Sequence, residues 1–186
     1  MGAVRHVRVR SETDAELVAV AQVVREAFGP HKGVDDLLLA LRRSSAWRGL
    51  SFVAEQEGVI VGHVCFTRGW LDAPSKLVEV LILSPMSVLP EWQRKGIGTA
   101  LIKESIKLLA GRAEPLVFLE GNPRFYAHAG FWPASPAGFT APSTRIPDAA
   151  FQFCALPGYE AWMTGALAYP DVFWEMDAVG LRSSIN

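Results

Sequence analysis

The 186-residue sequence has little cysteine, no long apolar run and almost no net charge. Cys65 and Cys154 stand far apart in apolar, strand-like contexts, which favours two buried thiols over a disulfide. No histidine and cysteine residues have the spacing of metal ligands, so we expect no metal site. Apolar residues make up 50% of the chain and charged residues 20%, as is typical of a globular protein.

Membrane-spanning and nucleic-acid-binding classes are disfavoured for related reasons. Apolar runs such as Val80 to Leu83 are far shorter than the roughly 20 residues that cross a bilayer. The first ten residues lack the continuous apolar core of a signal peptide. Basic residues gather only in pairs such as Arg94–Lys95, without the positive stripe of a nucleic-acid-binding surface. We therefore expect a soluble cytoplasmic protein with no membrane or nucleic-acid partner.

Hydrophobic periodicity predicts an α/β fold with a mixed, mostly antiparallel sheet, folded as one domain over residues 1–186. A capping box, in which Thr13 and Glu16 satisfy each other's amides, predicts the start of the first helix. The chain shows no internal repeat. The expected elements are strands at 6–10, 51–55, 59–67, 77–83, 116–119 and 151–156, and helices at 17–28, 37–43, 98–110 and 124–129.

The most informative segment runs from Gln93 to Thr99, between a strand and a strong helix. The first amides of a helix have no intrahelical partner, and the helix dipole favours negative charge there. Gly96 and Gly98 let the backbone approach an anion closely, and Arg94 and Lys95 add positive charge. These features predict a site for a pyrophosphate group.

Three kinds of phosphate loop compete for this segment. A Walker loop is excluded because no Gly-x4-Gly-Lys-Ser/Thr occurs in the chain. A Rossmann turn is favoured by Gly96-Ile97-Gly98 and by Glu120 at the end of the next strand. It is disfavoured because Leu101 occupies the third glycine position and because a dozen residues, two of them prolines, separate the preceding strand from the loop. The third kind is an acyl-CoA loop.

The run Gln93-Arg94-Lys95-Gly96-Ile97-Gly98 resembles the Gln/Arg-x-x-Gly-x-Gly/Ala motif of the GNAT N-acetyltransferases. A second segment, from Gly121 to Phe131, resembles that family's closing motif, with Asn122 and with Tyr126 three residues before Gly130-Phe131. The two motifs occur in the family's order. The likeness covers about residues 7–156 and is greatest to the small bacterial YhbS-like group.

The resemblance implies acetyl-CoA (coenzyme A) as the cofactor and an amine as the acceptor. It further implies a V-shaped split between the strand that reaches Val88 and the strand that starts at Leu116, in which the pantetheine arm lies. Backbone groups of Met86 and Val88 would pair with that arm, and Asn122 would orient its end. The remaining cofactor-binding residues implied are Arg94, Lys95, Gly96, Ile97, Gly98 and Thr99.

For the chemistry, the resemblance implies that Tyr126 is the general acid that protonates the departing thiolate. The base is left open. Glu79 is a candidate, although it lies further from the phosphate loop than the family's strand carboxylate, and Ile82 stands near that position. Other candidates are Ser84, His63 and Glu120, acting through water.

We therefore expect an N-acetyltransferase that moves an acetyl group from acetyl-CoA to a primary amine of a small molecule or a protein by direct attack. The alternatives are a CoA-binding regulatory module without catalysis and a dinucleotide-binding protein. The acceptor pocket is expected to use the loop 29–34, with His31 and Lys32, the segment 70–75 and the aromatic extension 157–186. Whether that extension caps the pocket or packs a homodimer is left open.

Overall fold

The computed structural model describes residues 7–29 and 32–181, which divide into two compact units. Unit 1 comprises Met1–Thr67 with Leu83–Leu109, and unit 2 comprises Arg68–Ile82 with Ala110–Asn186. Strands β3 (Val59–Asp72) and β4 (Leu77–Val88) each have one part in each unit.

The sheet of unit 1 is antiparallel. β1 (Arg8–Ser11) pairs with β2 (Trp47–Gln56), and β2 pairs with the first part of β3. The predicted capping box is confirmed, since Glu16 accepts the Thr13 amide at 2.8 Å. It opens a 3-10 turn, Asp14–Glu16, that leads into α1 (Leu17–Phe28).

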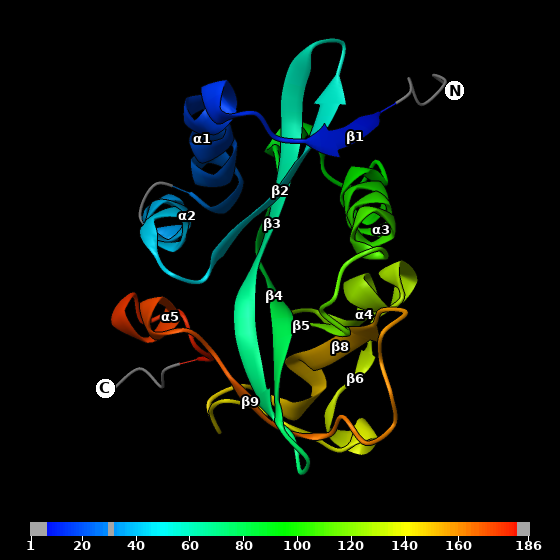
Figure 1. Ribbon diagram of the computed structural model, residues 1–186. Coiled ribbons are helices and arrows are strands. Elements are labelled where there is room, and N and C mark those ends of the chain that lie inside the picture. The colour runs from blue at the N-terminus through cyan, green and yellow to red at the C-terminus, as the bar shows by residue number, and fades with distance from the viewer. Residues whose placement is uncertain (1–6, 30–31, 182–186) are drawn as a thin grey trace. The chain divides into compact units, whose positions relative to one another are not determined.

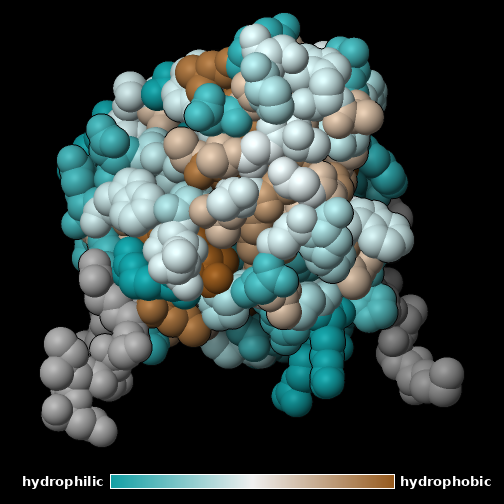
Figure 2. All heavy atoms as spheres, turned by 90° about the horizontal axis from the view of Figure 1, so that it is seen from below, coloured by the Kyte–Doolittle hydropathy of each residue, from teal (hydrophilic) through white to brown (hydrophobic). Residues whose placement is uncertain are grey.

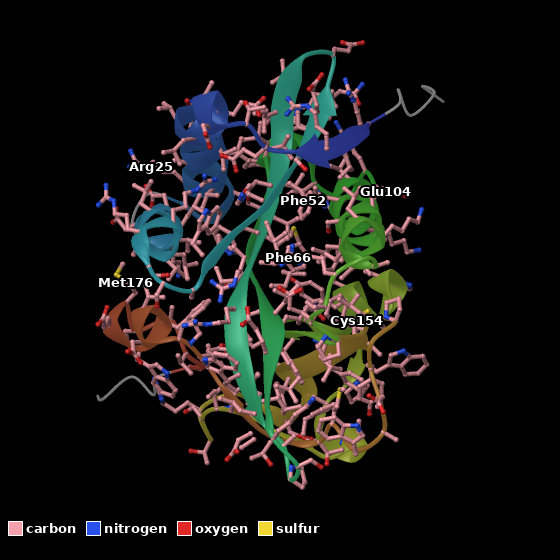
Figure 3. All side chains as sticks on the ribbon, in the orientation of Figure 1. Arg25, Phe52, Phe66, Glu104, Cys154 and Met176 are labelled. Carbon is pink, nitrogen blue, oxygen red and sulfur yellow. The ribbon has the colours of Figure 1, made fainter. Side chains whose placement is uncertain are left out.

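Helices cover both faces of this sheet (Figure 1). α1 and α2 (Val34–Arg43) lie on one side of β2 and β3, and α3 (Ile97–Leu109) lies on the other. Toward α1 and α2, the core is a cluster of buried residues, namely Val20, Val24, Leu38, Val53 and Cys65. Toward α3, the rings of Phe52 and Phe66 meet edge to face at 5.9 Å (Figure 3). Arg25 of α1 forms an ion pair with Asp35 of α2 at 2.7 Å.

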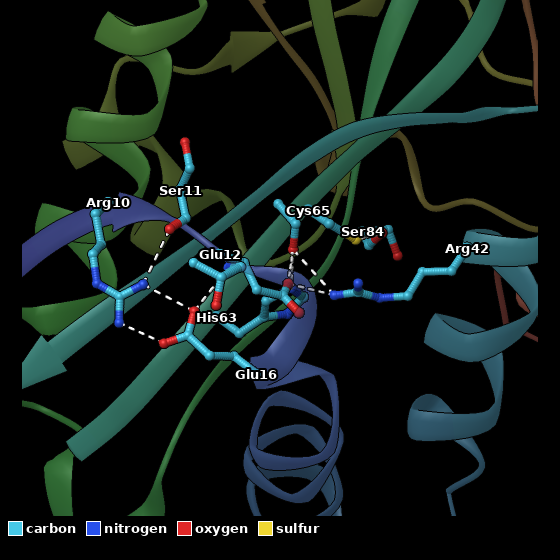
Figure 4. A network of polar contacts seen from close by, with 10 residues as sticks. Arg10, Ser11, Glu12, Glu16, Arg42, His63, Cys65 and Ser84 are labelled. Carbon is cyan, nitrogen blue, oxygen red and sulfur yellow. Dashed lines mark hydrogen bonds and ion pairs between the residues drawn. The ribbon is translucent and has the colours of Figure 1, made fainter. Parts of the chain in front are cut away.

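In unit 1, Arg42 extends from α2 into a buried polar network next to the link between β1 and α1 (Figure 4). The Glu12 carboxylate accepts hydrogen bonds from the Arg42 guanidinium and from the Ser51 hydroxyl. Ser51 Oγ lies 2.8 Å from His63 Nε2, and Glu12 Oε2 lies 3.6 Å from the same nitrogen. The network thus joins the β1–α1 link, α2, β2 and β3.

Burial determines the charge state of His63 in this network. The side chain is fully buried, and burial together with nearby Arg42 lowers its pKa from 6.5 to about 3. Its Nδ1 atom is buried without a hydrogen-bond partner. His63 is therefore neutral at physiological pH and serves as a structural hydrogen-bond donor or acceptor toward Ser51.

The shifted pKa predicts how stability depends on pH. Between pH 6.5 and about 3 the unfolded chain binds a proton at His63 that the folded protein does not. The free energy of unfolding should therefore fall as pH falls through this range, by up to about 1.4 kcal/mol per pH unit from this residue. Urea unfolding of His63→Leu across this range should show a shallower pH slope than the wild type. The exposed His128, replaced in His128→Gln, is the control, and equal slopes for wild type and His63→Leu would contradict the assignment.

In unit 2 the sheet is mixed. β5 (Leu116–Glu120) pairs in parallel with β4 through Leu81–Val117 and Ile82–Phe118. β5 also pairs antiparallel with β8 (Phe151–Ala155), and β8 pairs with β6 (Trp132–Pro133). The mixed α/β architecture predicted from the sequence is confirmed, as are the two free, buried thiols.

The C-terminal extension is built into unit 2. β9 (Gly165–Ala168) pairs antiparallel with β3 at Trp70–Asp72 and in parallel with β7 (Phe139–Thr140), and α5 (Asp171–Glu175) follows. The sequence does not predict β9, because its residues, Gly-Ala-Leu-Ala, have low β-propensity. On the face seen from below, apolar side chains occupy several small areas among hydrophilic ones (Figure 2).

Several boundaries differ from those expected. β3 continues past Thr67 because β9 supplies hydrogen-bond partners at Trp70–Asp72. β4 continues through Ser84-Pro85 to Val88, beyond the expected end at Leu83. The expected helix at 124–129 is α4 (Pro123–Tyr126) followed by a 3-10 turn, and α2 starts three residues earlier than expected. β1 starts at Arg8, and His6 lies outside the described residues.

Within residues 7–29 and 32–181, no helix is long and apolar enough to span a bilayer.

Candidate functional site

The predicted phosphate loop connects β4 to α3 within unit 1. A 3-10 turn, Pro90–Trp92, follows β4, and the Gln93 side chain donates to the Val88 carbonyl at 2.9 Å, which ties the loop to the strand end. Arg94 has φ 60° and Gly96 has φ 81°. Alternation of left-handed and ordinary residues turns successive amides toward one concave side, as in backbone nests that bind anions.

The amides that follow are those of a helix start. α3 begins at Ile97, and its first hydrogen bond runs from the Ala100 amide to the Gly96 carbonyl at 3.0 Å. The amides of residues 97–99 therefore have no intrahelical acceptor. Residues 93–96 are exposed, and the Lys95 ammonium lies 4.9 Å from the centre of the Trp92 ring. The arrangement suits a phosphate or pyrophosphate group.

The two β4 residues expected to pair with a ligand arm also lie in unit 1. Val88 is buried and Met86 is half-buried. This part of β4 packs closely against β3. A Cβ added to Gly62 of β3 would stand 3.1 Å from the Ser87 carbonyl oxygen and 3.4 Å from the Val88 side chain. The Ser87 hydroxyl is buried without a hydrogen-bond partner.

The second motif forms the turn after β5 in unit 2. Asn122 is the N-cap of α4, and its side-chain oxygen accepts the Arg124 amide at 3.0 Å. Pro123 occupies the first helical position, where its missing amide hydrogen costs nothing. The cap therefore orients the short helix that carries Tyr126, and Asn122 itself is exposed.

Tyr126 packs directly against the backbone at the end of β5. A Cβ placed on Gly121 would stand 2.4 Å from the Tyr126 ring, so only glycine leaves room for the ring in this position. The rings of Phe125 and Phe131 contact Tyr126 edge to face at 4.9 and 5.8 Å. Burial raises the pKa of the Tyr126 hydroxyl to about 12, so this group keeps its proton at physiological pH.

Glu120, the last residue of β5, lies one position before Gly121. One carboxylate oxygen accepts the Gly180 amide at 2.9 Å, and the Tyr169 hydroxyl also donates to the carboxylate. Burial raises the pKa of Glu120, while Gly180, Arg145 and Tyr169 act in the opposite direction. Glu120 is one of the possible bases expected from the sequence. The sequence does not predict its hydrogen bonds, because Tyr169 and Gly180 are remote in sequence and follow no motif.

Glu79 lies elsewhere in unit 2, near the amino-terminal end of β4. It lines a groove of about 580 Å³ together with Arg112 and Glu114, which form an ion pair at 2.6 Å. Of the other candidate bases, His63 belongs to the buried network of unit 1, and the Ser84 carbonyl accepts a hydrogen bond from Cys65 Sγ at 3.1 Å. His31 lies outside the described residues.

Comparison with known proteins identifies the family. A family model described as the acetyltransferase (GNAT) domain matches residues 47–133. The chain is 36% identical to the uncharacterized N-acetyltransferase YjhQ of Escherichia coli over 66% of this chain and 68% of that protein. The chain belongs to the GNAT family of N-acetyltransferases.

Solved structures agree with this assignment. The GNAT N-acetyltransferase YhbS of Escherichia coli, in complex with CoA, has a TM-score of 0.79 and 22% identity, over 93% of this chain and 94% of that one. A GNAT acetyltransferase of Brucella melitensis, in complex with acetyl-CoA, has a TM-score of 0.69 and 28% identity, over 91% and 99% of the two chains. The resemblance stated from the two motifs is thereby confirmed, whereas the roles of individual site residues stay predictions.

The contact between Gly121 and Tyr126 in this GNAT protein is open to a direct test. Gly121→Ala should displace the Tyr126 ring and lower the free energy of unfolding by about 1–3 kcal/mol, because the added methyl overlaps the ring. Urea unfolding measures the loss, and near-UV circular dichroism reports the ring's environment.

The matched control is Gly111→Ala, since a Cβ there would meet nothing within 4 Å. Its unfolding free energy should change by no more than about 0.5 kcal/mol. In a Tyr126→Ala background Gly121→Ala should cost less than in the wild type. An unchanged cost would show that the ring does not occupy this position.

Proposed function

We propose that this GNAT protein transfers the acetyl group of acetyl-CoA to a primary amine by direct attack of the amine on the thioester. The observation that carries the proposal is the loop Gln93–Thr99, in which the first amides of α3 have no intrahelical acceptor. Arg94 and Gly96 adopt left-handed backbone conformations in this loop, and the chain belongs to the GNAT family. Acetyl-CoA is the donor because its diphosphate fits such a loop and because the YhbS and Brucella melitensis proteins were solved with CoA and acetyl-CoA.

Donor binding is assigned to the following residues of unit 1. The amides of residues 94–99 hold the diphosphate, and the side chains of Arg94 and Lys95 add positive charge around it. Backbone groups of Met86 and Val88 hydrogen-bond the pantetheine arm as an added strand would. The family motif assigns Asn122, which caps α4, the orientation of the thiol end of the arm.

Tyr126 is assigned the role of general acid. Collapse of the tetrahedral adduct breaks the bond between carbon and sulfur, and a thiolate is a better leaving group when a hydroxyl donates to it. The pKa of Tyr126, about 12, keeps the hydroxyl protonated over the whole working range. The proton is lost only as pH rises through about 12, so Tyr126 itself should produce no alkaline loss of activity below about pH 11.

Tyr126→Phe tests this role with little change in packing. The variant should lower kcat for amine-dependent CoA release by about 10²-fold or more, because only the hydroxyl is removed. Thiol release can be followed with a disulfide reagent and a panel of primary amines, namely putrescine, lysine and an alanyl dipeptide. The Kd for acetyl-CoA, measured by calorimetry, should stay within about twofold of the wild-type value.

Two outcomes would contradict the proposal. Unchanged kcat in Tyr126→Phe would remove the general acid from Tyr126. Tight acetyl-CoA binding by the wild type, with no thiol release for any amine in the panel, would favour a CoA-binding regulatory module over an enzyme.

Gly96→Val tests the loop. A branched side chain disfavours the φ of 81° that this residue adopts and should turn the loop amides away from the diphosphate. The Kd for acetyl-CoA should rise by about tenfold or more.

Gly58→Val is the matched control, because Gly58 has φ 80° in the β2–β3 turn and a Cβ added to it would, as at Gly96, meet nothing within 4 Å. It should show similar backbone strain in unfolding experiments and an unchanged Kd. Equal losses of affinity in the two variants would show that general destabilisation, and not the loop, determines binding.

A further inference from the structure

Unit 2 contains a groove that the proposed acetyl transfer does not use. The groove has a volume of about 580 Å³. It is lined by residues 76–79 at the start of β4, by residues 111–115 between α3 and β5, and by Gly158 and Met163 of the C-terminal extension. All of these residues belong to unit 2. The volume falls in the range of about 300–1,000 Å³ that is typical of small-molecule sites.

The groove lies at the end of β5 opposite to Tyr126. Pro115, which lines the groove, directly precedes β5, whereas Gly121, against which the Tyr126 ring packs, directly follows it. The five residues of β5 span about 16 Å, at about 3.3 Å per residue. A ligand in the groove would therefore be separate from the acyl transfer proposed beside Tyr126.

An ion pair forms one wall of the groove. The Arg112 guanidinium donates to the Glu114 carboxylate through Nε at 2.9 Å and through Nη2 at 2.6 Å. The Glu114 side chain is 7% exposed and the Arg112 side chain is 35% exposed, so the acidic partner is buried and the basic partner is partly open. A guanidinium has five N–H groups, and this contact uses two of them. Arg112 can therefore donate to a ligand without leaving Glu114.

Two further side chains of opposite charge line the same groove. The pKa of Arg112 is raised chiefly by its hydrogen bonds with Glu114 and also by the charge of Glu79, so the Glu79 carboxylate lies near the guanidinium. Lys76 is exposed, and its ammonium lies 5.5 Å from the centre of the Trp162 ring. This cation–π contact keeps the ammonium beside the groove.

The charges of the groove balance, and this balance restricts the ligand. Lys76 and Arg112 carry two positive charges, and Glu79 and Glu114 carry two negative ones. A ligand with charge of one sign only would be repelled by two groove residues as well as attracted by two. A zwitterion offers a partner to each sign, so the groove favours a ligand that carries both charges.

Apolar surface lies beside these charges. The Leu77 side chain is 55% exposed, and the buried Val78 and Met163 also line the groove. An apolar group of the ligand would remove the exposed Leu77 surface from water, which is favourable. The ligand should therefore carry an aliphatic part next to its two charged groups.

We propose that this groove is a binding site for a zwitterionic amino acid with an aliphatic side chain. Glu79 binds the ammonium group, and Arg112 and Lys76 bind the carboxylate. The aliphatic side chain contacts Leu77 and Met163. The site is independent of the proposed acetyl transfer, because its residues lie at the other end of β5.

Three compounds with one carbon skeleton test the charge requirement on the full chain. L-leucine carries both charges, 3-methylbutylamine lacks the carboxylate, and 4-methylpentanoate lacks the ammonium group. Titration of the ¹⁵N-labelled protein should show that leucine shifts the amide signals of residues 76–79 and 111–115. Each single-charge analogue should have a Kd at least about tenfold higher than that of leucine. Equal Kd values for leucine and either analogue would overturn the proposal.

Gly111→Phe tests the position of the ligand. A Cβ on Gly111 would meet nothing within 4 Å, and the backbone there is not left-handed, so the ring can enter the groove without straining the fold. The Kd for leucine should rise by about tenfold or more, while the Kd for acetyl-CoA stays within about twofold of the wild-type value. Gly111→Ala, which leaves most of the groove open, is the matched control. An unchanged leucine Kd in Gly111→Phe would show that leucine does not bind in the groove.

Two charge-removing variants assign the partners of the ligand. Glu79→Gln should reduce the advantage of leucine over 4-methylpentanoate, because the ammonium group loses its partner. Lys76→Gln should reduce the advantage of leucine over 3-methylbutylamine, because the carboxylate loses one of its partners. Glu175→Gln removes an exposed carboxylate outside the groove and should match the wild type. Unchanged ratios in both variants would contradict the assignment.

Leucine is itself a primary amine, and one outcome separates the two sites. If leucine shifts the amide signals of residues 121–126 in place of those at 76–79, and Gly111→Phe has no effect, leucine binds as an acetyl acceptor and the groove proposal is wrong. If leucine binds in the groove and the wild type releases no thiol with any amine, the groove proposal stands and acetyl transfer fails.

Discussion

The chemistry assigned to this protein depends on the close packing of the Tyr126 ring on the backbone of Gly121. The separation of 2.4 Å between the ring and a Cβ on Gly121 leaves room for no side chain, and this contact determines where the phenol lies relative to β5. One steric constraint thus places the Tyr126 hydroxyl next to the end of β5.

Burial changes the pKa of two side chains near the end of β5, Tyr126 and Glu120. Removal from water raises the pKa of Tyr126 to about 12 and keeps it a donor. Burial also raises the pKa of Glu120, while the hydrogen bond from Gly180, the charge of Arg145 and the hydrogen bond from Tyr169 act in the opposite direction. The C-terminal extension, whose role the sequence left open between a cap and a dimer contact, supplies two of these three groups.

Unit 1 handles charge in a different way. Its loop collects partial positive charge from backbone amides, whereas its buried network brings together Glu12, Arg42, Ser51 and His63 on the opposite side from α3. His63 is fully buried and neutral. The hydrogen bonds of this cluster connect α2 and the β1–α1 link to the sheet. From the sequence, His63 was one of the possible bases. Its full burial and its hydrogen bond with Ser51 give it a structural role.

The sequence alone determined the family, the order of the main elements and the two motifs, because a Gly-x-Gly helix start and a capping box are local and depend on neighbouring residues only. It also predicted that Tyr126 lies on a short helix after a buried strand, although that helix, expected at 124–129, is α4 at Pro123–Tyr126. It did not reveal β9, whose Gly-Ala-Leu-Ala sequence forms a strand only because β3 and β7 offer hydrogen-bond partners. Nor did it reveal the contacts of Glu120 with Tyr169 and Gly180, which are 49 and 60 residues away along the chain. Only the tertiary structure decided these, since long-range pairing and burial are set by which distant segments pack together.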